Sequence, residues 1–308
     1  KGWLPLEDDV AADEPVVPLT QKAIFGHGYI SGSVSMTNLV NSSGVIGSDV
    51  TGVGTARNAG AAAIYGIDKA LHAWGSDDSS VVSLSNLISN SGVVSSDVTG
   101  VGSARQGPAG AGYGEVKAIF GYGAVAGGAK TALSNLVSSS GVVATDVSGV
   151  GTARSHLAAA GYGGDKAIFG YGTTGSVSSL SNLVTNVGVI GSDVSGVGTA
   201  RTELAATVYG TDKAIFGYGN SGSVTGITNL VSNSGVVASD VSGVGTARSA
   251  LAAAGFGGDK AIFGYGYDGS SYVGMSNLVN SSGVVASDVS RVGSARGYLW
   301  AAGYSISA

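Results

Sequence analysis

The chain has 308 residues, a formal net charge of −5 and 54 glycines; hydrophobic residues make up 44% of it and charged residues only 11%. The lack of cysteine excludes disulfides, thiolate metal sites and cysteine nucleophiles. Its apolar runs are too short to cross a bilayer, and its acidic balance is unlike the basic surfaces that bind nucleic acid. We therefore expect neither membrane insertion nor a nucleic-acid partner.

Residues 1–20 differ in composition from the rest of the chain. They contain five acidic residues and three of the four prolines, a combination typical of an extended arm or linker. Within the arm, Trp3, Leu4 and Leu6 offer an apolar anchor for a neighbouring subunit, with a disordered end as the alternative. Because the chain starts at Lys1 rather than at Met, we expect a processed product or a piece of a longer protein.

One unit occurs six times over residues 21–308. The phrase Lys-Ala-Ile-Phe-Gly-Tyr-Gly starts at Lys117, Lys166, Lys213 and Lys260, with close variants at Lys22 and Lys69. The units therefore start near residues 21, 68, 116, 165, 212 and 259. Self-similarity at such a fixed period indicates a repeat architecture, here a single domain of six units.

Each unit contains four short strand candidates separated by turn signals, and the fourth copy shows them clearly. Residues 157–161 have small side chains, and a Gly-Gly-Asp turn follows them at 163–165. Residues 166–171 are apolar at consecutive positions, which is typical of a strand buried on both faces. Residues 180–185 and 189–194 complete the unit. No stretch of ten or more residues has helical spacing of its apolar side chains, so we predict no helices.

Four strands in a unit of about 40–50 residues predict a β-propeller blade. The small first strand fits the crowded axis of the ring. The chain enters at the second strand of a unit and ends with an isolated first strand, residues 298–304. We therefore predict a six-bladed propeller whose closing blade combines three N-terminal strands with one C-terminal strand. A β-solenoid with two coils per unit is the alternative.

The order of these motifs resembles a kelch-type propeller repeat over residues 21–308. It departs from that pattern because Gly-Tyr-Gly replaces a Gly-Gly doublet and the fourth strand lacks a Trp. The phrases Asp-Lys-Ala-Ile-Phe-Gly-Tyr-Gly and Ser-Gly-Val-Val-Ala-Ser-Asp-Val are also similar to repeats in tail-fibre and other virion proteins of marine bacteriophages. That resemblance implies an extracellular virion component that binds a host surface or holds a fibre together.

Charged residues occupy fixed places in each unit. Because unpaired charges are costly to bury, the repeated Lys, Asp and Arg residues are predicted to make ion pairs within or between blades, rather than six identical ligand sites. The repeated Arg and Asp residues are Arg57, Arg105, Arg154, Arg201, Arg248 and Arg296, and Asp49, Asp97, Asp146, Asp193, Asp240 and Asp288.

Histidines and aromatic residues give no catalytic signal. His27, His72 and His156 fall at three different repeat positions, so we predict no metal site, cofactor or catalytic set. His27 and Trp74 stand where other copies have Tyr, which suggests a ring of packed aromatic side chains.

Variation between the copies is concentrated in two connections that leave the same face of a propeller. The positions after each Arg differ (Asn58, Gln106, His156, Glu203, Tyr298), and so do the loops between the second and third strands. Two of these loops combine aromatic and acidic groups that suit a sugar: Trp74, Asp77 and Asp78, and Tyr267, Asp268 and Tyr272. Neutral drift of exposed loops is the alternative explanation.

From the sequence we expect a non-enzymatic ring of a phage fibre or similar appendage that recognises a host receptor or glycan. A purely structural assembly or decoration protein of a virion or cell surface, packing on other virion proteins, is the alternative. An enzyme is the third hypothesis, disfavoured by the scarcity of His and of clustered acids. The sequence does not fix the ligand or the oligomeric state.

Overall fold

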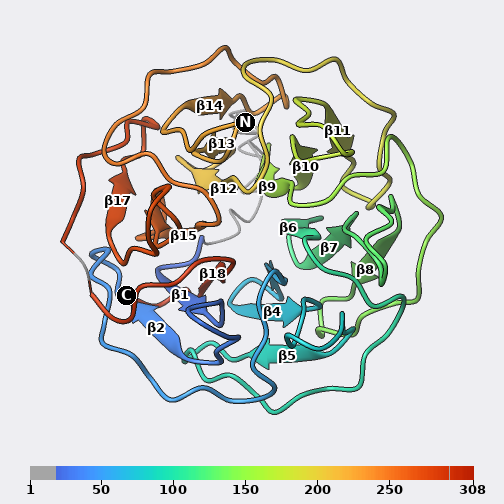
Figure 1. Cartoon of the computed structure of the whole chain (residues 1–308), viewed down its shortest axis with the longest axis horizontal. Helices are drawn as coiled ribbons and strands as arrows, with labels where there is room; N and C mark the ends of the chain where they lie inside the picture. Colours follow the sequence, from blue (N-terminus) through green and yellow to red (C-terminus); the bar gives the residue numbers. More distant parts are fainter. Residues whose placement is uncertain (1–18, 291) are drawn as a thin grey trace, which may run out of the picture.

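A computed structural model describes residues 19–290 and 292–308. Within these residues every regular element is a β-strand, and the strands form six three-stranded antiparallel sheets of one pattern. Figure 1 shows the six sheets set around a central axis. The protein is therefore an all-β, propeller-like repeat fold. The described ranges contain no helical stretch with the length and apolar character that a bilayer crossing needs.

Each sheet has an inner, a middle and an outer strand. The inner strands are β3 (Ala61–Tyr65), β6 (Ala109–Tyr113), β9 (Ala158–Tyr162), β12 (Ala205–Tyr209), β15 (Ala252–Phe256) and β18 (Trp300–Tyr304). The middle strands are β1 (Lys22–Gly26), β4 (Lys69–Ala73), β7 (Lys117–Gly121), β10 (Lys166–Gly170), β13 (Lys213–Gly217) and β16 (Lys260–Gly264). The outer strands are β2 (Thr37–Val40), β5 (Ser85–Ile88), β8 (Ser134–Val137), β11 (Ser181–Val184), β14 (Thr228–Val231) and β17 (Ser276–Val279).

The middle strands are buried on both faces, as their apolar runs predict. In β10, Ala167, Ile168 and Phe169 are all fully buried although successive side chains point to opposite faces. Neighbouring sheets cover those faces, so that Phe169 packs in one cluster with Ile119 of the preceding sheet. The hydrophobic core is thus divided into layers between adjacent sheets.

The two ends of the chain meet in one sheet. Strand β18 pairs antiparallel with β1, with Trp300 opposite Gly26 and Tyr304 opposite Lys22, and β2 completes the sheet. Strand β18 also contacts the inner strands β15 and β3 of the two neighbouring sheets.

The expected fourth strand is not a regular strand. In the fourth copy, residues 189–194 touch β11 only through two isolated bridges, Val184 to Ile190 and Ser181 to Val194. Two residues of β11 lie between these bridges, but three lie between them on the other side, so the pairing is bulged. The Asn182 amide donates to the carbonyl of Gly191 at 3.0 Å inside the bulge. The prediction of four-stranded sheets is therefore corrected to three strands and a bulged outer segment.

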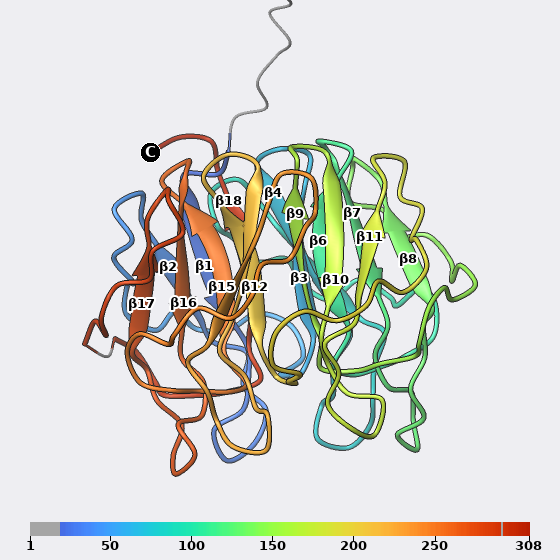
Figure 2. The same ribbon diagram turned by 90° about the horizontal axis from the view of Figure 1, so that it is seen from above.

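The two faces of the molecule differ. Tight turns join the inner and middle strands on one face, which we call the turn face; Gly163 in one of them has a φ of +61°. The connections from middle to outer strands and the returns to the next inner strand form the opposite loop face. Figure 2 shows these longer connections below the sheets, with the C-terminus at the turn face above them.

The predicted N-terminal arm falls mostly outside the described residues, since residues 1–18 are not among them. Its last residue, Thr20, is buried, and its carbonyl accepts a hydrogen bond from the amide of Gly258 at 3.2 Å. The chain therefore enters the fold at the turn face.

Candidate functional site

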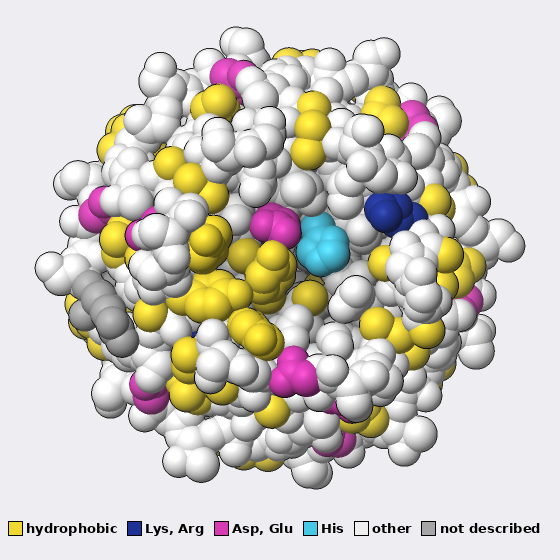
Figure 3. All heavy atoms as spheres, viewed as in Figure 1, with side chains coloured by type: hydrophobic (Ala, Val, Ile, Leu, Met, Phe, Trp, Pro, Cys, Tyr) yellow, Lys and Arg dark blue, Asp and Glu magenta, His cyan; other side chains and the backbone are white. Residues whose placement is uncertain are grey.

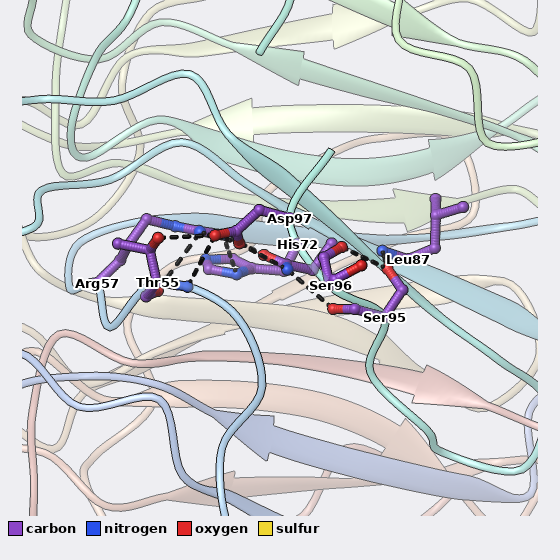
Figure 4. Close-up of polar contacts among 8 residues, drawn as sticks. Thr55, Arg57, His72, Leu87, Ser95, Ser96 and Asp97 are labelled. Carbon is purple, nitrogen blue, oxygen red and sulfur yellow. Dashed lines mark hydrogen bonds and ion pairs between the residues drawn. The ribbon is translucent and has the colours of Figure 1, made fainter. Parts of the chain in front are cut away.

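A buried arginine organises a polar network in each sheet. In the sheet of β3, β4 and β5, Arg57 donates to Asn86 Oδ1 at 2.5 Å. It also donates to Asp97 Oδ1 at 3.2 Å (Figure 4). Asp97 also accepts bonds from the amide of Thr55 at 2.9 Å and from its hydroxyl at 2.7 Å. Burial alone raises the pKa of Asp97, but these hydrogen bonds and the Arg57 charge outweigh it and lower the pKa to about 2.

The network recurs in the other sheets, but the Asp that pairs with an Arg is not the one that precedes it in the sequence. Each Arg precedes an inner strand. Four of them pair with an Asp of the same sheet about 40 residues later in the chain, rather than with the Asp just before the Arg. Arg296, in the sheet that joins the two ends of the chain, pairs with Asp49. In the sheet of β12, β13 and β14, Arg201 bonds Asn229 at 2.7 Å. The ion pairs are Arg57–Asp97, Arg105–Asp146, Arg154–Asp193, Arg248–Asp288 and Arg296–Asp49, at 3.2 to 4.0 Å.

The repeated lysines do not join this network. Lys69, Lys166 and Lys260 pair instead with the Asp directly before each of them, at 2.7 to 2.9 Å, where the middle strand begins at the turn face. The lysine side chains are 43–48% exposed, so the two sets of charges have different roles. The arginine set stabilises the interior of each sheet, whereas the lysine set is solvated.

Trp74 belongs to the packing of the ring. It is fully buried, the Arg105 guanidinium lies 4.5 Å from its ring centroid, and its Nε1 donates to the carbonyl of Ser103 at 3.1 Å. The prediction of Trp74 as an exposed platform for a ligand is therefore wrong. Its other predicted place, in a ring of packed aromatic side chains, agrees with Tyr122, Tyr171, Tyr218 and Tyr265, which lie at 4.3 to 4.7 Å from Arg154, Arg201, Arg248 and Arg296.

His27 takes the sixth place in that aromatic ring, next to two further departures from the repeat. His72 replaces a middle-strand Phe and Trp300 replaces an inner-strand Ala. The His27 and His72 rings lie 4.5 Å apart, and His72 stacks on Trp300 at 4.7 Å. Both His27 ring nitrogens, His72 Nε2 and Trp300 Nε1 have no hydrogen-bond partner among the described residues. We call this group the histidine seam.

The histidine seam is kept neutral by its surroundings. Burial lowers the pKa of His27 to about 3, helped by the positive charge of Arg57 and opposed by Asp97. Burial, Arg57 and His27 also lower the pKa of His72. These two histidines are therefore uncharged core residues at neutral pH. Among the described residues no three His, Asp or Glu side chains gather as a set of metal ligands.

The acidic residues of the predicted binding loops serve the loops themselves. Asp77 accepts bonds from Ser79 and Ser80, and Asp268 accepts bonds from Ser270 and Ser271 in the equivalent turn. Asp78 instead joins two loops, since it accepts the amide of Ser33 at 2.6 Å and the Nδ2 of Asn58 at 3.2 Å. The two predicted binding groups therefore differ: Trp74 is buried away from Asp77 and Asp78, whereas Tyr267 and Tyr272 remain partly exposed.

The loop of Tyr267 and Tyr272 forms an aromatic cluster with a third tyrosine. The Tyr267 and Tyr272 rings lie 5.7 Å apart at 64°, and the Tyr29 and Tyr272 rings lie 6.1 Å apart at 65°. Tyr29 comes from the connection between β1 and β2, so the cluster spans the first and last sheets. We call Tyr29, Tyr267 and Tyr272 the tyrosine cluster, and all three are half-buried.

A ring of six peptide groups surrounds the axis at the loop face. The residue two places after each repeated Arg donates its N–H to the carbonyl of the preceding one at 2.7 to 2.9 Å, and all six have φ between +50° and +60°. The six residues are Ala59, Gly107, His156, Glu203, Ala250 and Tyr298. Only His156, Glu203 and Tyr298 carry large side chains, whereas the other three residues are Ala or Gly.

His156, Glu203 and Tyr298 converge where the axis reaches the loop face, and we call them the axial cluster. The Tyr298 hydroxyl donates to Glu203 Oε1 at 2.9 Å, and the rings of His156 and Tyr298 lie 6.3 Å apart. All three line a depression of about 70 Å³. Figure 3 shows this face, with a histidine beside an acidic group at its centre and hydrophobic side chains next to them.

A larger cavity opens at the other end of the axis. It has a volume of about 670 Å³ and is lined by inner-strand residues, among them Tyr113, Tyr162 and Phe256. Its charged groups include the ion pairs of Lys166 and Lys260 with their neighbouring Asp residues. Specific ligand sites need a few convergent polar groups, and the depression with the axial cluster offers them.

The sequence signal for the axial cluster was present but incomplete. His156, Glu203 and Tyr298 stand out as variable positions after Arg, whereas the residues named as binding candidates lay only in the loops. Aligning each copy on its Arg shows Ala or Gly at the same position in three units. Comparison with known protein families and with curated proteins finds no match for this chain.

Proposed function

We propose that the chain is a six-bladed, kelch-like β-propeller that binds a ligand on its loop face. In this proposal the sheet of β18, β1 and β2 is the closing blade, and the ring is a non-enzymatic component of a phage tail fibre or similar appendage. It acts outside the cell, on the virion surface, and recognises a host receptor or glycan. The pairing of β18 with β1 supports the closing blade.

One observation carries the binding proposal: the copies differ where their side chains converge. Of 13 tyrosines, nine occupy repeated positions, five at inner strands and four in the aromatic ring. The other four are Tyr29, Tyr267, Tyr272 and Tyr298, and all of them lie in one sector of the loop face. Drift of exposed loops would not gather them, whereas aromatic side chains beside a carboxylate suit recognition of a polar ligand.

Binding of the labelled chain to intact bacteria and to a panel of bacterial surface glycans tests this proposal. We expect saturable binding that weakens at least tenfold in the double variant Tyr267→Ala/Tyr272→Ala. The control variant Lys117→Ala/Lys213→Ala changes two exposed residues of the turn face and should bind like the parent. Absence of binding to every cell and glycan, with the fold intact, would reject the recognition function.

A structural assembly role is the second candidate, and an exposed valine girdle favours it. Six equivalent valines follow the glycine of each outermost turn and are 60–65% exposed: Val45, Val93, Val142, Val189, Val236 and Val284. Apolar side chains repeated around an outer edge suit packing against other proteins. Light scattering over a range of concentrations, with the six valines changed to Ser, tests this role. Assembly that persists in the Ser variant, or a ring that never associates, would reject it.

A further inference from the structure

The carboxylate of Glu203 has spare bonding capacity at the centre of the loop face. In the described part of the chain Glu203 forms no ion pair, and its side chain accepts only the Tyr298 hydroxyl, on Oε1. An ionised carboxylate offers about four lone-pair sites. Since Glu203 also lines the axial depression, most of its acceptor capacity is available to a ligand there.

The neighbours of Glu203 do not neutralise its charge. Burial lowers the pKa of His156, and this outweighs the opposite effect of Glu203, so His156 is uncharged at neutral pH. Burial and the charge of Glu203 both raise the pKa of Tyr298, which keeps its hydroxyl protonated as a donor. Lys130 adds a positive field at His156 but makes no ion pair with Glu203. The depression therefore carries a net negative charge.

The tyrosine cluster forms an aromatic corner next to this charge. The ring planes of Tyr267 and Tyr29 are inclined to that of Tyr272 by 64° and 65°, an edge-to-face arrangement. Tyr272 lies over Gly297, where a Cβ would be 2.6 Å from Tyr272 Cε1; the equivalent positions carry Asn58, Gln106, Ser155, Thr202 and Ser249. Glycine here lets Tyr272 approach the backbone directly before Tyr298, which itself lines the axial depression. The tyrosine cluster therefore lies beside the depression rather than in its lining.

Aromatic faces and an unpaired carboxylate share one preference, since both attract cations. The faces carry the negative lobe of the ring quadrupole, and they hold alkylated ammonium groups better than hydrated metal ions because methyl groups lose little hydration. At 10–15 Å³ for one water molecule, the 70 Å³ depression holds roughly five groups of that size, enough for an ammonium centre with its substituents.

We propose that Glu203, Tyr298 and the tyrosine cluster form a binding site for a cationic ammonium group on the recognised surface molecule. The inference rests on the proposed function and specifies its ligand chemistry. Two kinds of surface group present this chemistry: the protonated amine of a non-acetylated amino sugar, and a quaternary choline substituent. The carboxylate pairs with the charge, while the tyrosine rings surround its carbon-bound faces.

Calorimetric titration of the full chain with small probes tests the ammonium site. The probes are choline, glucosamine, N-acetylglucosamine and 3,3-dimethylbutanol, an uncharged molecule of the shape of choline. We expect one of the two cations to bind at least tenfold more tightly than its uncharged counterpart. Glu203→Gln, which keeps an acceptor for Tyr298 but removes the charge, should weaken that binding about tenfold. Lys117→Ala/Lys213→Ala is the control.

The two cations are separated by pH. Glucosamine loses its charge as the pH rises above the pKa of its amine, whereas choline does not. Binding of glucosamine that fades at high pH therefore identifies an amino-sugar site, and constant binding of choline identifies a quaternary site. Equal affinity for charged and uncharged probes, or full affinity in Glu203→Gln, would overturn the ammonium inference.

The cell-binding assay distinguishes this inference from the proposed function. If bacteria bind in a manner that depends on Tyr267 and Tyr272 but choline and glucosamine do not compete, the ammonium inference fails and the recognition function stands. If the cations bind and depend on Glu203 while no cell or glycan is bound, the recognition function fails and the ammonium site stands.

Discussion

Acidification should weaken the histidine seam before it affects the rest of the ring. His27 is neutral in the folded protein because burial lowers its pKa to about 3, whereas an exposed histidine titrates near 6.5. Below pH 6.5 the unfolded chain binds a proton that folded His27 does not, so the free energy of unfolding falls as the pH falls. This loss continues down to the folded pKa, near pH 3.

The size of the effect follows from that difference in pKa. Each pH unit below 6.5 costs about 1.4 kcal/mol for His27, so the move from pH 7 to pH 4.5 costs about 3 kcal/mol. His72 is fully buried, and its lowered pKa adds a loss of the same sign. The pKa values of the Asp residues in the arginine networks are also lowered. These residues change the free energy of unfolding mainly below their ordinary pKa of 3.8, so they contribute little to its pH dependence above pH 4.5.

The repeat itself supplies the matched control. In His27→Tyr/His72→Phe/Trp300→Ala, each changed residue becomes the one that other copies carry at that position. Thermal melting of both proteins from pH 7 to pH 4.5 measures the difference, and His156 is common to both. We expect the melting temperature of the parent to fall by roughly 5 °C or more relative to the variant.

Equal pH dependence in the two proteins would refute this reasoning. So would an NMR titration in which the His27 imidazole of the folded protein protonates near pH 6.5, because the seam would then already be open to water. If the triple variant fails to fold, the same titration on the parent still decides the matter. A slope of opposite sign, with stability rising as the pH falls, would also contradict it.

The other predictions concern the frame of the ring. Asp146→Ala should lower the free energy of unfolding by about 2 kcal/mol in urea titrations because it leaves buried Arg105 without its counter-ion. Asp165→Ala breaks an exposed pair and should cost less than about 1 kcal/mol. Equal costs would contradict the different roles assigned to the arginine and lysine pairs. Gly54→Ala should lower the melting temperature more than Gly127→Ala, since both have φ near +80° but only at Gly54 would a Cβ lie 2.5 Å from Asp97 Oδ1. Removal of residues 297–308 should expose an edge of β1 and cause association in light scattering, and a monodisperse truncated chain would refute the role of β18.

Much of the fold could be predicted from local patterns. The apolar run of residues 167–169 indicates a strand covered on both faces, and the period of the repeat predicts equivalent sheets. The bulge after β11 could not be found this way, because it depends on where the Asn182 side chain donates its hydrogen bond. The partner of Arg57 was also out of reach, since Asp97 is distant in sequence and Asp49 is nearer.

The candidate site was predictable as a face but not as a set of side chains. The sequence suggested two roles for Trp74, in a binding loop and in a ring of packed aromatic side chains, and the structure supports the second, with the Arg105 guanidinium over the Trp74 ring. Tyr267 and Tyr272 were visible because their loop is unusual. Glu203 and Tyr298 are 95 residues apart and meet only because the inner strands converge on one axis.

Both ends of the described chain lie on the turn face, where Thr20 packs beside Gly303 and the C-terminus follows β18. Any covalent attachment through Leu19 or through Ala308 therefore starts from the side opposite the axial cluster. A tether, a surface or a larger particle joined at either end would leave the loop face directed outward. Attachment at either terminus would thus leave the loop face, where the six copies differ most, exposed to the surroundings.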